Sequence, residues 1–180
     1  MSNVLVGKGD STGMAFRAPA GTSLPSYPGA SLSADWKAIG NVGEDGLTLK
    51  LPSGDVIRNW ALDPERRVNT ENGQLTVPFI HTTKSTLETC FGDNNITYVA
   101  ADSTHGNLTS ATFSPDVFAE PAAYLFLMKD GEKRAFVGAT NALISEMDDI
   151  AFKGTEATQW NAKIDGTLTF MVDDGEVTSS

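Results

Sequence analysis

The main pattern along the chain is an alternation of apolar and polar positions over short runs, which predicts β-strands. Leu47-Thr48-Leu49-Lys50-Leu51 alternates without a break, so its three leucines share one face. The turn Pro52-Ser53-Gly54-Asp55 follows, and residues 56–60 return with high strand propensity. These two runs predict a β-ribbon that projects from the domain over about residues 44–60. A two-stranded ribbon is marginal alone in water, so its leucines need cover from the chain's own core or from a neighbour.

A second pair of alternating runs predicts a hairpin. Residues 66–70 and 74–80 flank Glu71-Asn72-Gly73. Asn-Gly between alternating runs is a strong local hairpin signal. We therefore predict that these two runs pair with each other.

One short stretch has helical spacing. Leu87, Cys90 and Phe91 lie at positions i, i+3 and i+4, and Ser85-x-x-Glu88 matches a capping box. Gly92 is placed to end the helix. The sequence predicts one amphipathic helix over about residues 86–91, whose apolar stripe packs on a sheet. Cys90 lies on that stripe, so we interpret it as a small core residue and not as a reactive thiol.

The second half of the chain predicts strand after turn. Candidate strands cover residues 95–100, 108–113, 122–129, 133–140, 148–152, 157–165 and 167–172. Residues 122–128 are continuously apolar, which favours a strand buried on both faces. Asp130-Gly131 joins this run to residues 134–137 as a tight hairpin.

The predicted fold is mainly β: a sandwich or barrel of two packed sheets, with one short flanking α-helix and a projecting ribbon. The 180 residues fit a single domain, and 17 Gly and 8 Pro residues favour short strands and turns. Residues 173–180 are polar and are predicted to be a frayed tail.

The N-terminal 32 residues predict an extended arm. Residues 18–29 are too rich in Pro and Gly for a helix or a central strand. The arm lies on its own domain or reaches a neighbouring subunit, and the second explains better how so polar a segment stays ordered. Residues 7–13 contain three glycines and Lys8, but the order does not match a phosphate-binding loop, in which Lys ends the glycine run and opens a helix.

Composition narrows the functional classes. Thirteen basic and 23 acidic residues give a net charge of −10, with eight acids between Glu146 and Glu176, which disfavours tight binding to nucleic-acid phosphates. The one cysteine excludes an intrachain disulfide and a multi-cysteine metal site. No apolar run is long enough for a membrane span, and the first residues do not form a signal sequence, so we expect synthesis in a cytoplasm.

No catalytic pattern is present in the sequence. His81 and His105 lack Cys or Asp partners at ligand spacing, and neither Asp93-Asn94-Asn95 nor Asp148-Asp149 opens a calcium-binding loop. Serine-hydrolase and zinc-protease motifs are also missing. We predict a protein that is not an enzyme and needs neither a cofactor nor a metal.

Two short motifs carry a family resemblance. Residues 18–25 read A-P-x-G-T-x-L-P, and residues 39–46 read I-G-x-V-x-E-D-G. Residues 142–150 match, loosely, a third motif of the same family. In these motifs and in the order of its elements the chain resembles the tail tube (major tail) proteins of long, non-contractile-tailed bacteriophages.

The resemblance implies a structural subunit of the virion tail. Such subunits form homohexameric rings that stack around a channel, through which DNA passes during ejection without specific binding. The implied partners are further copies of the chain and the tail terminator, tail-tip and tape measure proteins, with no membrane insertion.

The resemblance also suggests contact residues. A loop between rings would use Glu44, Asp45, Leu47, Leu49, Leu51, Arg58 and Trp60. An arm between subunits would use Pro19, Leu24 and Pro25. The alternative is a monomeric β-sandwich that binds carbohydrate or a receptor, which would need Trp36, Trp60 and Trp160 to gather on one exposed face.

Overall fold

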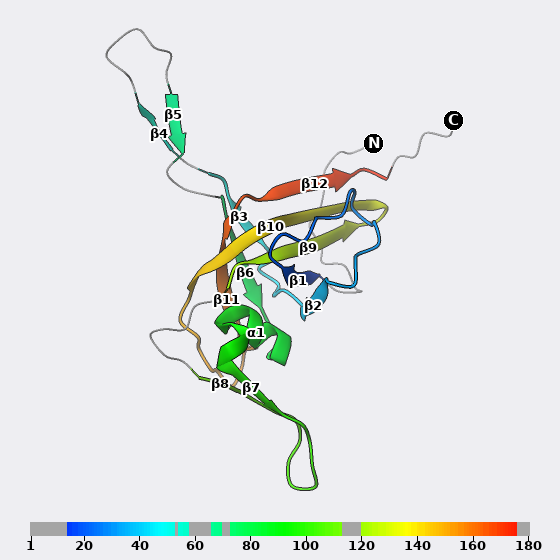
Figure 1. Ribbon diagram of the computed structural model, residues 1–180, viewed down its shortest axis with the longest axis vertical. Coiled ribbons are helices and arrows are strands. Elements are labelled where there is room, and N and C mark those ends of the chain that lie inside the picture. The colour runs from blue at the N-terminus through cyan, green and yellow to red at the C-terminus, as the bar shows by residue number, and fades with distance from the viewer. Residues whose placement is uncertain (1–13, 53, 58–65, 70–72, 113–119, 176–180) are drawn as a thin grey trace.

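The computed structural model describes residues 14–52, 54–57, 66–69, 73–112 and 120–175. Its elements, in chain order, are β1 (Ala15–Pro19), β2 (Lys37–Gly40), β3 (Thr48–Lys50), β4 (Gly54–Ile57), β5 (Arg66–Asn69), β6 (Gly73–Phe79), α1 (Lys84–Phe91), a 3-10 turn η1 (Asp93–Asn95), β7 (Ile96–Val99), β8 (Leu108–Ala111), β9 (Ala122–Asp130), β10 (Lys133–Met147), β11 (Trp160–Gly166) and β12 (Thr169–Asp173). The predicted mainly β fold with one α-helix is confirmed (Figure 1).

One large antiparallel sheet forms the body of the molecule. Its strand order is β2-β1-β9-β10-β11-β6-β3, and β12 also pairs with β10. After β2 the chain returns to the far side of the sheet, where Val42 bridges Phe79 and the Gly43 N–H donates to the Pro78 carbonyl at 2.7 Å. This return brings the two ends of the sheet together, so the sheet folds into two layers around a core.

The main core lies between these two layers and α1. It joins apolar side chains from β6, β9, β10 and β11 with those of the helix. Phe79 of β6 meets Phe126 of β9 with ring centroids 6.4 Å apart, and Phe91 of α1 packs edge-on against Trp160 of β11 at 5.7 Å. Aromatic contacts of this kind add to the gain from burial, so they tie the two layers and the helix together.

A second apolar cluster lies on the outer face of β1, β9 and β10. Its buried members are Ala18, Trp36, Ala123, Leu125 and Phe136. Leu24 and Leu32, from the segment between β1 and β2, pack against it. Because β9 is covered on one face by the main core and on the other by this segment, residues 122–126 are all buried, as their continuous apolar run predicts.

Strand β10 is long enough to serve both layers. Its first part pairs with β9 on one side and β12 on the other, and its last part pairs with β11. Gly166 at the end of β11 pairs with Ala142, and Thr169 at the start of β12 pairs with Gly138. β11 and β12 therefore follow one another along the same edge of β10.

Helix α1 begins two residues earlier than the sequence predicts. Thr83, not Ser85, is the N-cap, and its hydroxyl accepts a hydrogen bond from the Thr86 N–H. Both residue types suit this position, so their order alone does not decide between them. The Thr86 hydroxyl donates to the Ile39 carbonyl at 2.9 Å, which fixes the helix against β2. Gly92 ends the helix with φ 83°, as its placement predicts.

The predicted ribbon and hairpin pair differently from our expectation. Residues 48–50 join the large sheet as β3 beside β6, and the separate ribbon consists of β4 and β5. The prediction failed because the alternation in residues 47–51 also suits an edge strand with one covered face. Gly73 lies in β6 and lacks the positive φ of a type I′ turn. Its side-chain position faces Leu168 at 3.3 Å, so close packing explains this glycine better than a turn does.

Two further strand predictions need correction. Residues 148–152 form no strand, and the next strand begins at Trp160 instead of residue 157. Asp148 instead forms an ion pair with Lys163, and Lys153 pairs with Glu156 inside the connecting loop. In the described part of the chain, no helix is long and apolar enough to cross a membrane.

Candidate functional site

Four of the large apolar side chains exposed on the body lie on or next to two strands, while Tyr27, Leu143 and Phe152 are exposed elsewhere on it. Leu49 and Leu51, in and just after β3, are 38% and 70% exposed. Phe170 and Val172 of β12 are 52% and 51% exposed. We call these four residues the apolar end; β3 and β12 lie on the upper side of the body in Figure 1.

The apolar end adjoins an unpaired strand edge. Phe170 and Val172 stand beside Val137 and Ala135 of β10. Among the described strands, β12 pairs with β10 alone. An exposed edge with apolar side chains is a ready surface for another strand or another chain.

The predicted loop residues have different environments. Glu44 and Asp45 are exposed, Leu47 is half-buried against the main core, and Leu49 and Leu51 belong to the apolar end. Arg58 and Trp60 lie outside the described residues. The three leucines therefore differ in their environment, because only Leu47 packs against the core of its own subunit.

The predicted arm lies on its own sheet where the structure describes it. Pro19 is the last residue of β1 and is exposed, whereas Leu24 and Pro25 are half-buried. The Gly21 N–H donates to the Thr140 carbonyl at 2.7 Å. A Cβ at Gly138 would lie 2.7 Å from a Leu24 methyl carbon, so glycine at this position makes room for the leucine.

The apolar face of α1 is buried. Leu87, Cys90 and Phe91 are each less than a tenth exposed. Burial raises the pKa of the Cys90 thiol to about 12, so the thiol stays protonated and unreactive at neutral pH. These three residues thus belong to the core.

A hairpin made of β7 and β8 projects from the body at the opposite end from β3 and β12 (Figure 1). Val99 pairs with Leu108, so their side chains share one face of the hairpin, and they are 45% and 48% exposed. Tyr98 lies on the other face, with the Lys84 ammonium 5.4 Å from its ring centroid. The hairpin contacts the body mainly through α1.

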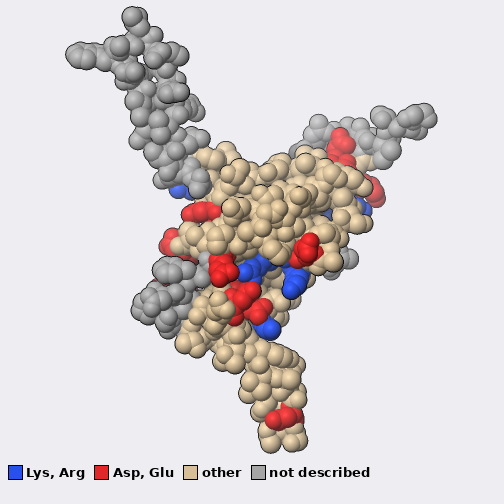
Figure 2. All heavy atoms as spheres, viewed as in Figure 1, with Lys and Arg blue, Asp and Glu red and all other residues tan. Residues whose placement is uncertain are grey.

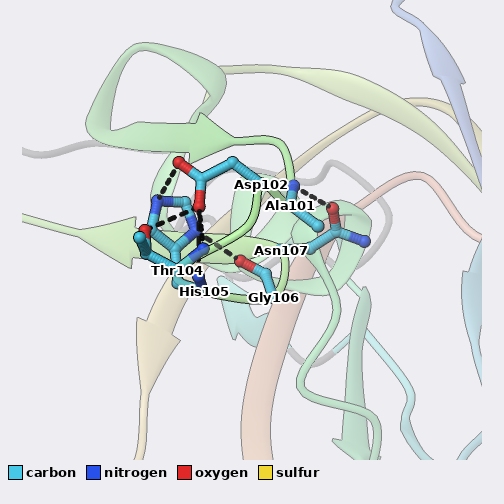
Figure 3. A network of polar contacts seen from close by, with 6 residues as sticks. All are labelled: Ala101, Asp102, Thr104, His105, Gly106 and Asn107. Carbon is cyan, nitrogen blue, oxygen red and sulfur yellow. Dashed lines mark hydrogen bonds and ion pairs between the residues drawn. The ribbon is translucent and has the colours of Figure 1, made fainter.

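A network of hydrogen bonds shapes the tip of this hairpin (Figure 3). One Asp102 carboxylate oxygen accepts from the Thr104 N–H, the Thr104 hydroxyl and the His105 N–H, at 2.7, 2.7 and 3.1 Å. The other oxygen lies 3.3 Å from His105 Nε2, and the Asn107 side chain accepts from the Ala101 N–H at 2.9 Å. The hydrogen bonds from Thr104 and His105 lower the pKa of Asp102. The network accounts for Asp102 and His105 as parts of a turn.

Our sequence analysis did not single out this hairpin. A signal was available, since residues 96–111 contain a single acid, Asp102, and neither Lys nor Arg. In Figure 2 the projecting hairpin is correspondingly tan except for one acidic group near its tip. Loss of charge together with exposed apolar residues is typical of the centre of an interface.

A polar cleft of about 450 Å³ lies between α1, β1 and β2. It contains the ion pair between Arg17 and Asp93, whose nitrogen and oxygen are 2.6 Å apart. Burial lowers the pKa of Arg17, but the hydrogen bond and charge of Asp93 more than offset this and raise it overall. Acidic and basic groups also lie side by side over this region in Figure 2. Because this ion pair joins β1 to the turn after α1, we interpret the cleft as part of the packing between helix and sheet.

Metal ligands are not grouped in the described residues. No three His, Cys, Asp or Glu side chains within them lie close enough together to hold an ion.

The described residues form a β-rich body with exposed apolar side chains at β3 and β12 and on the opposite β7–β8 hairpin. Comparison with known proteins gives the family: the chain belongs to the phage tail tube proteins, because the model of the family "Phage tail tube protein" matches residues 3–177. No curated protein matches the chain. The chain is thus a structural subunit of a phage tail tube, and its place is the tail of the virion.

Proposed function

We propose that this chain forms rings of six subunits that stack into a tube, and that the tube encloses the channel through which phage DNA is ejected into the host. The number six follows from the family resemblance. Made in the host cytoplasm, the subunits meet the tail terminator, tail-tip and tape measure proteins at the ends and in the lumen of the tube.

The observation that carries the proposal is the apolar end. Its four side chains lie on two strands of a stable body, and the described part of the chain does not cover them. Burying one such side chain contributes about 1.5–3 kcal/mol before the cost of ordering. Six subunits repeat this contact at every stacking step, so the gains combine through avidity.

We include the predicted loop and arm in this proposal, with roles adjusted to their environments. Glu44, Asp45, Leu49, Leu51, Arg58 and Trp60 would contact the next ring. In the arm, Leu24 is occupied by its own subunit, which leaves Pro19 and the exposed Tyr27 for a neighbour in the same ring.

Substitution of Leu49 tests the proposal. Leu49→Asp should leave a folded subunit, because the side chain is already partly exposed, but the subunit should not polymerise, since a carboxylate would be buried unpaired between rings. Leu49→Ile is the matched control and should form tubes. Circular dichroism reports the fold and electron microscopy reports the tubes. Long tubes formed by a folded Leu49→Asp subunit would contradict the proposed contact.

The charge of the chain suits a channel for DNA. Six copies at −10 each sum to −60 per ring, and few lysines are available to neutralise phosphates. We expect no detectable binding of duplex DNA to assembled tubes at ~0.15 M salt. Micromolar, salt-sensitive binding would show that the channel is adhesive, against the proposal.

Among the described residues, the two tryptophans do not support the alternative of a carbohydrate-binding module. Such a module needs exposed aromatic rings grouped on one face, and Trp36 and Trp160 are both buried in the two apolar clusters.

A further inference from the structure

The β7–β8 hairpin presents an apolar surface that the described part of its own subunit leaves exposed. Val99 and Leu108 stand opposite each other on one face, and both are about half exposed. A two-stranded ribbon of this kind gains little stability from its own contacts in water. The hydrogen bonds around Asp102 nevertheless fix the turn at its tip, so the hairpin is shaped before any partner arrives.

Charge identifies the kind of partner that fits. Asp102 is the only acidic residue in residues 96–111, and His105 is the only histidine. A carboxylate oxygen of Asp102 lies 3.3 Å from His105 Nε2. With neither Lys nor Arg, the hairpin lacks the cationic side chains that attract nucleic-acid phosphate or an anionic lipid surface. Two copies of a chain with a charge of −10 repel each other, and they meet at least cost through a surface with almost no charge.

The position of the hairpin indicates where on a second copy it docks. It projects from one end of the long axis of the molecule, and β3 and β12, which carry the apolar end, lie toward the other (Figure 1). A contact between two different surfaces at opposite ends does not close on itself, so it propagates from copy to copy.

We propose that the β7–β8 hairpin of one subunit docks on the apolar end of the next subunit along the tube. This inference rests on the proposed function, because it names the surface that covers Leu49, Leu51, Phe170 and Val172 when rings stack. Val99 and Leu108 then lose their exposure to water at the same step.

Substitution of Leu108 provides the first test. Leu108→Asp should leave the subunit folded and able to form rings, and should raise the protein concentration needed for tubes at least about tenfold. Leu108→Ile keeps the apolar contact and should form tubes at the wild-type concentration. Circular dichroism, sedimentation and electron microscopy would be measured on the full chain.

The outcomes separate this inference from the proposed function. A wild-type chain that forms neither rings nor tubes contradicts the proposed function itself. Wild-type tubes together with unchanged assembly of Leu108→Asp would show that the hairpin serves another partner, and would overturn the inference. Loss of rings as well as tubes would place the hairpin between subunits of one ring, and would also overturn it.

Cross-linking tests the docking position in assembled tubes and does not depend on a destabilising change. Leu108→Cys would be combined with Leu51→Cys or with Phe170→Cys, and tubes would be oxidised; Cys90 is buried and stays out of the reaction. A head-to-tail contact joins copy to copy, so a ladder of covalent multimers is expected from at least one pair. Leu108→Cys with Tyr27→Cys is the control and should give no ladder. Tubes that give no ladder with either pair would overturn the docking position.

Discussion

Strand β9 and the β7–β8 hairpin both contain apolar residues, yet the described part of the chain buries only those of β9. Residues 122–126 of β9 are each 2% exposed or less, because the main core lies on one face and the segment between β1 and β2 on the other. In the hairpin, Tyr98, Val99 and Leu108 are 44–48% exposed. The difference separates apolar residues that fold the subunit from those that are free for contact with a second copy.

Truncation of one residue from each region should show this difference most strongly. Phe126→Ala removes a fully buried ring and should lower the free energy of unfolding by ~3–5 kcal/mol. Leu108→Ala should change it by less than ~0.5 kcal/mol, since its side chain is half exposed. Urea denaturation of unassembled subunits measures both. Equal losses would mean that the hairpin belongs to the folding core.

Substitution at Gly138 tests the cover on the outer face of β9. A Cβ there would lie 2.7 Å from a Leu24 methyl carbon and 2.9 Å from the Tyr124 carbonyl oxygen, so Gly138→Ala should destabilise the subunit by ~1–3 kcal/mol. Adding Leu24→Ala should recover part of this loss by relieving one of the two contacts. Thermal unfolding of the single and double variants measures the coupling. If the two substitutions changed the unfolding free energy additively, Leu24 would not contact Gly138, and the arm would not lie on its own subunit here.

Loss of the N-cap of α1, the helix that the β7–β8 hairpin contacts, should have a smaller effect on stability. Thr83→Ala should cost ~1 kcal/mol by removing the acceptor for the Thr86 N–H. Ser85→Ala should change stability little, because the Ser85 side chain is not the cap. Chemical denaturation of both variants decides between them. A larger effect at Ser85 would restore the cap that the sequence predicts.

The smallest expected effect is a pH dependence confined to the hairpin tip. The hydroxyl and N–H of Thr104 and the N–H of His105 hold the pKa of Asp102 below its ordinary value of 3.8. Since the folded pKa is the lower one, the stabilisation of the turn is fully present above 3.8 and is lost as the pH falls through the folded value. Amide NMR shifts of Thr104 and His105 should report this transition, and Asp102→Asn should remove it. A midpoint at or above 3.8 would contradict the hydrogen-bonded turn.

Local patterns were sufficient to predict the parts of the fold that depend on local burial. The apolar run of β9 was predicted correctly, and so was the apolar stripe of Leu87, Cys90 and Phe91. Both patterns reflect burial of these side chains in the apolar clusters of the subunit. Strand partners depend on distant residues, so alternation alone did not show that Leu49 pairs beside Leu75 in the large sheet. The Asn72-Gly73 signal was misleading because close packing against Leu168, instead of a turn, accounts for Gly73.

The exposed apolar residues of the proposed contact surfaces were predictable only in part. Leu49 and Leu51 were identified because an alternating run needs cover, and both are exposed. Phe170, Val172, Val99 and Leu108 were not identified, since apolar residues in a strand do not reveal which side the chain itself covers. Only the arrangement of β12 at a sheet edge and of β7–β8 away from the body separates them from core residues.

Hydrogen exchange compared between unassembled subunits and tubes tests the central claim most directly. Amides of residues 96–111 and 169–173 should exchange fast in the subunit and at least about tenfold more slowly in the tube, because both surfaces become covered. Amides of β9 should exchange slowly in both forms, since their cover comes from their own chain. Tubes in which the hairpin and β12 exchange as fast as in the free subunit would contradict the account.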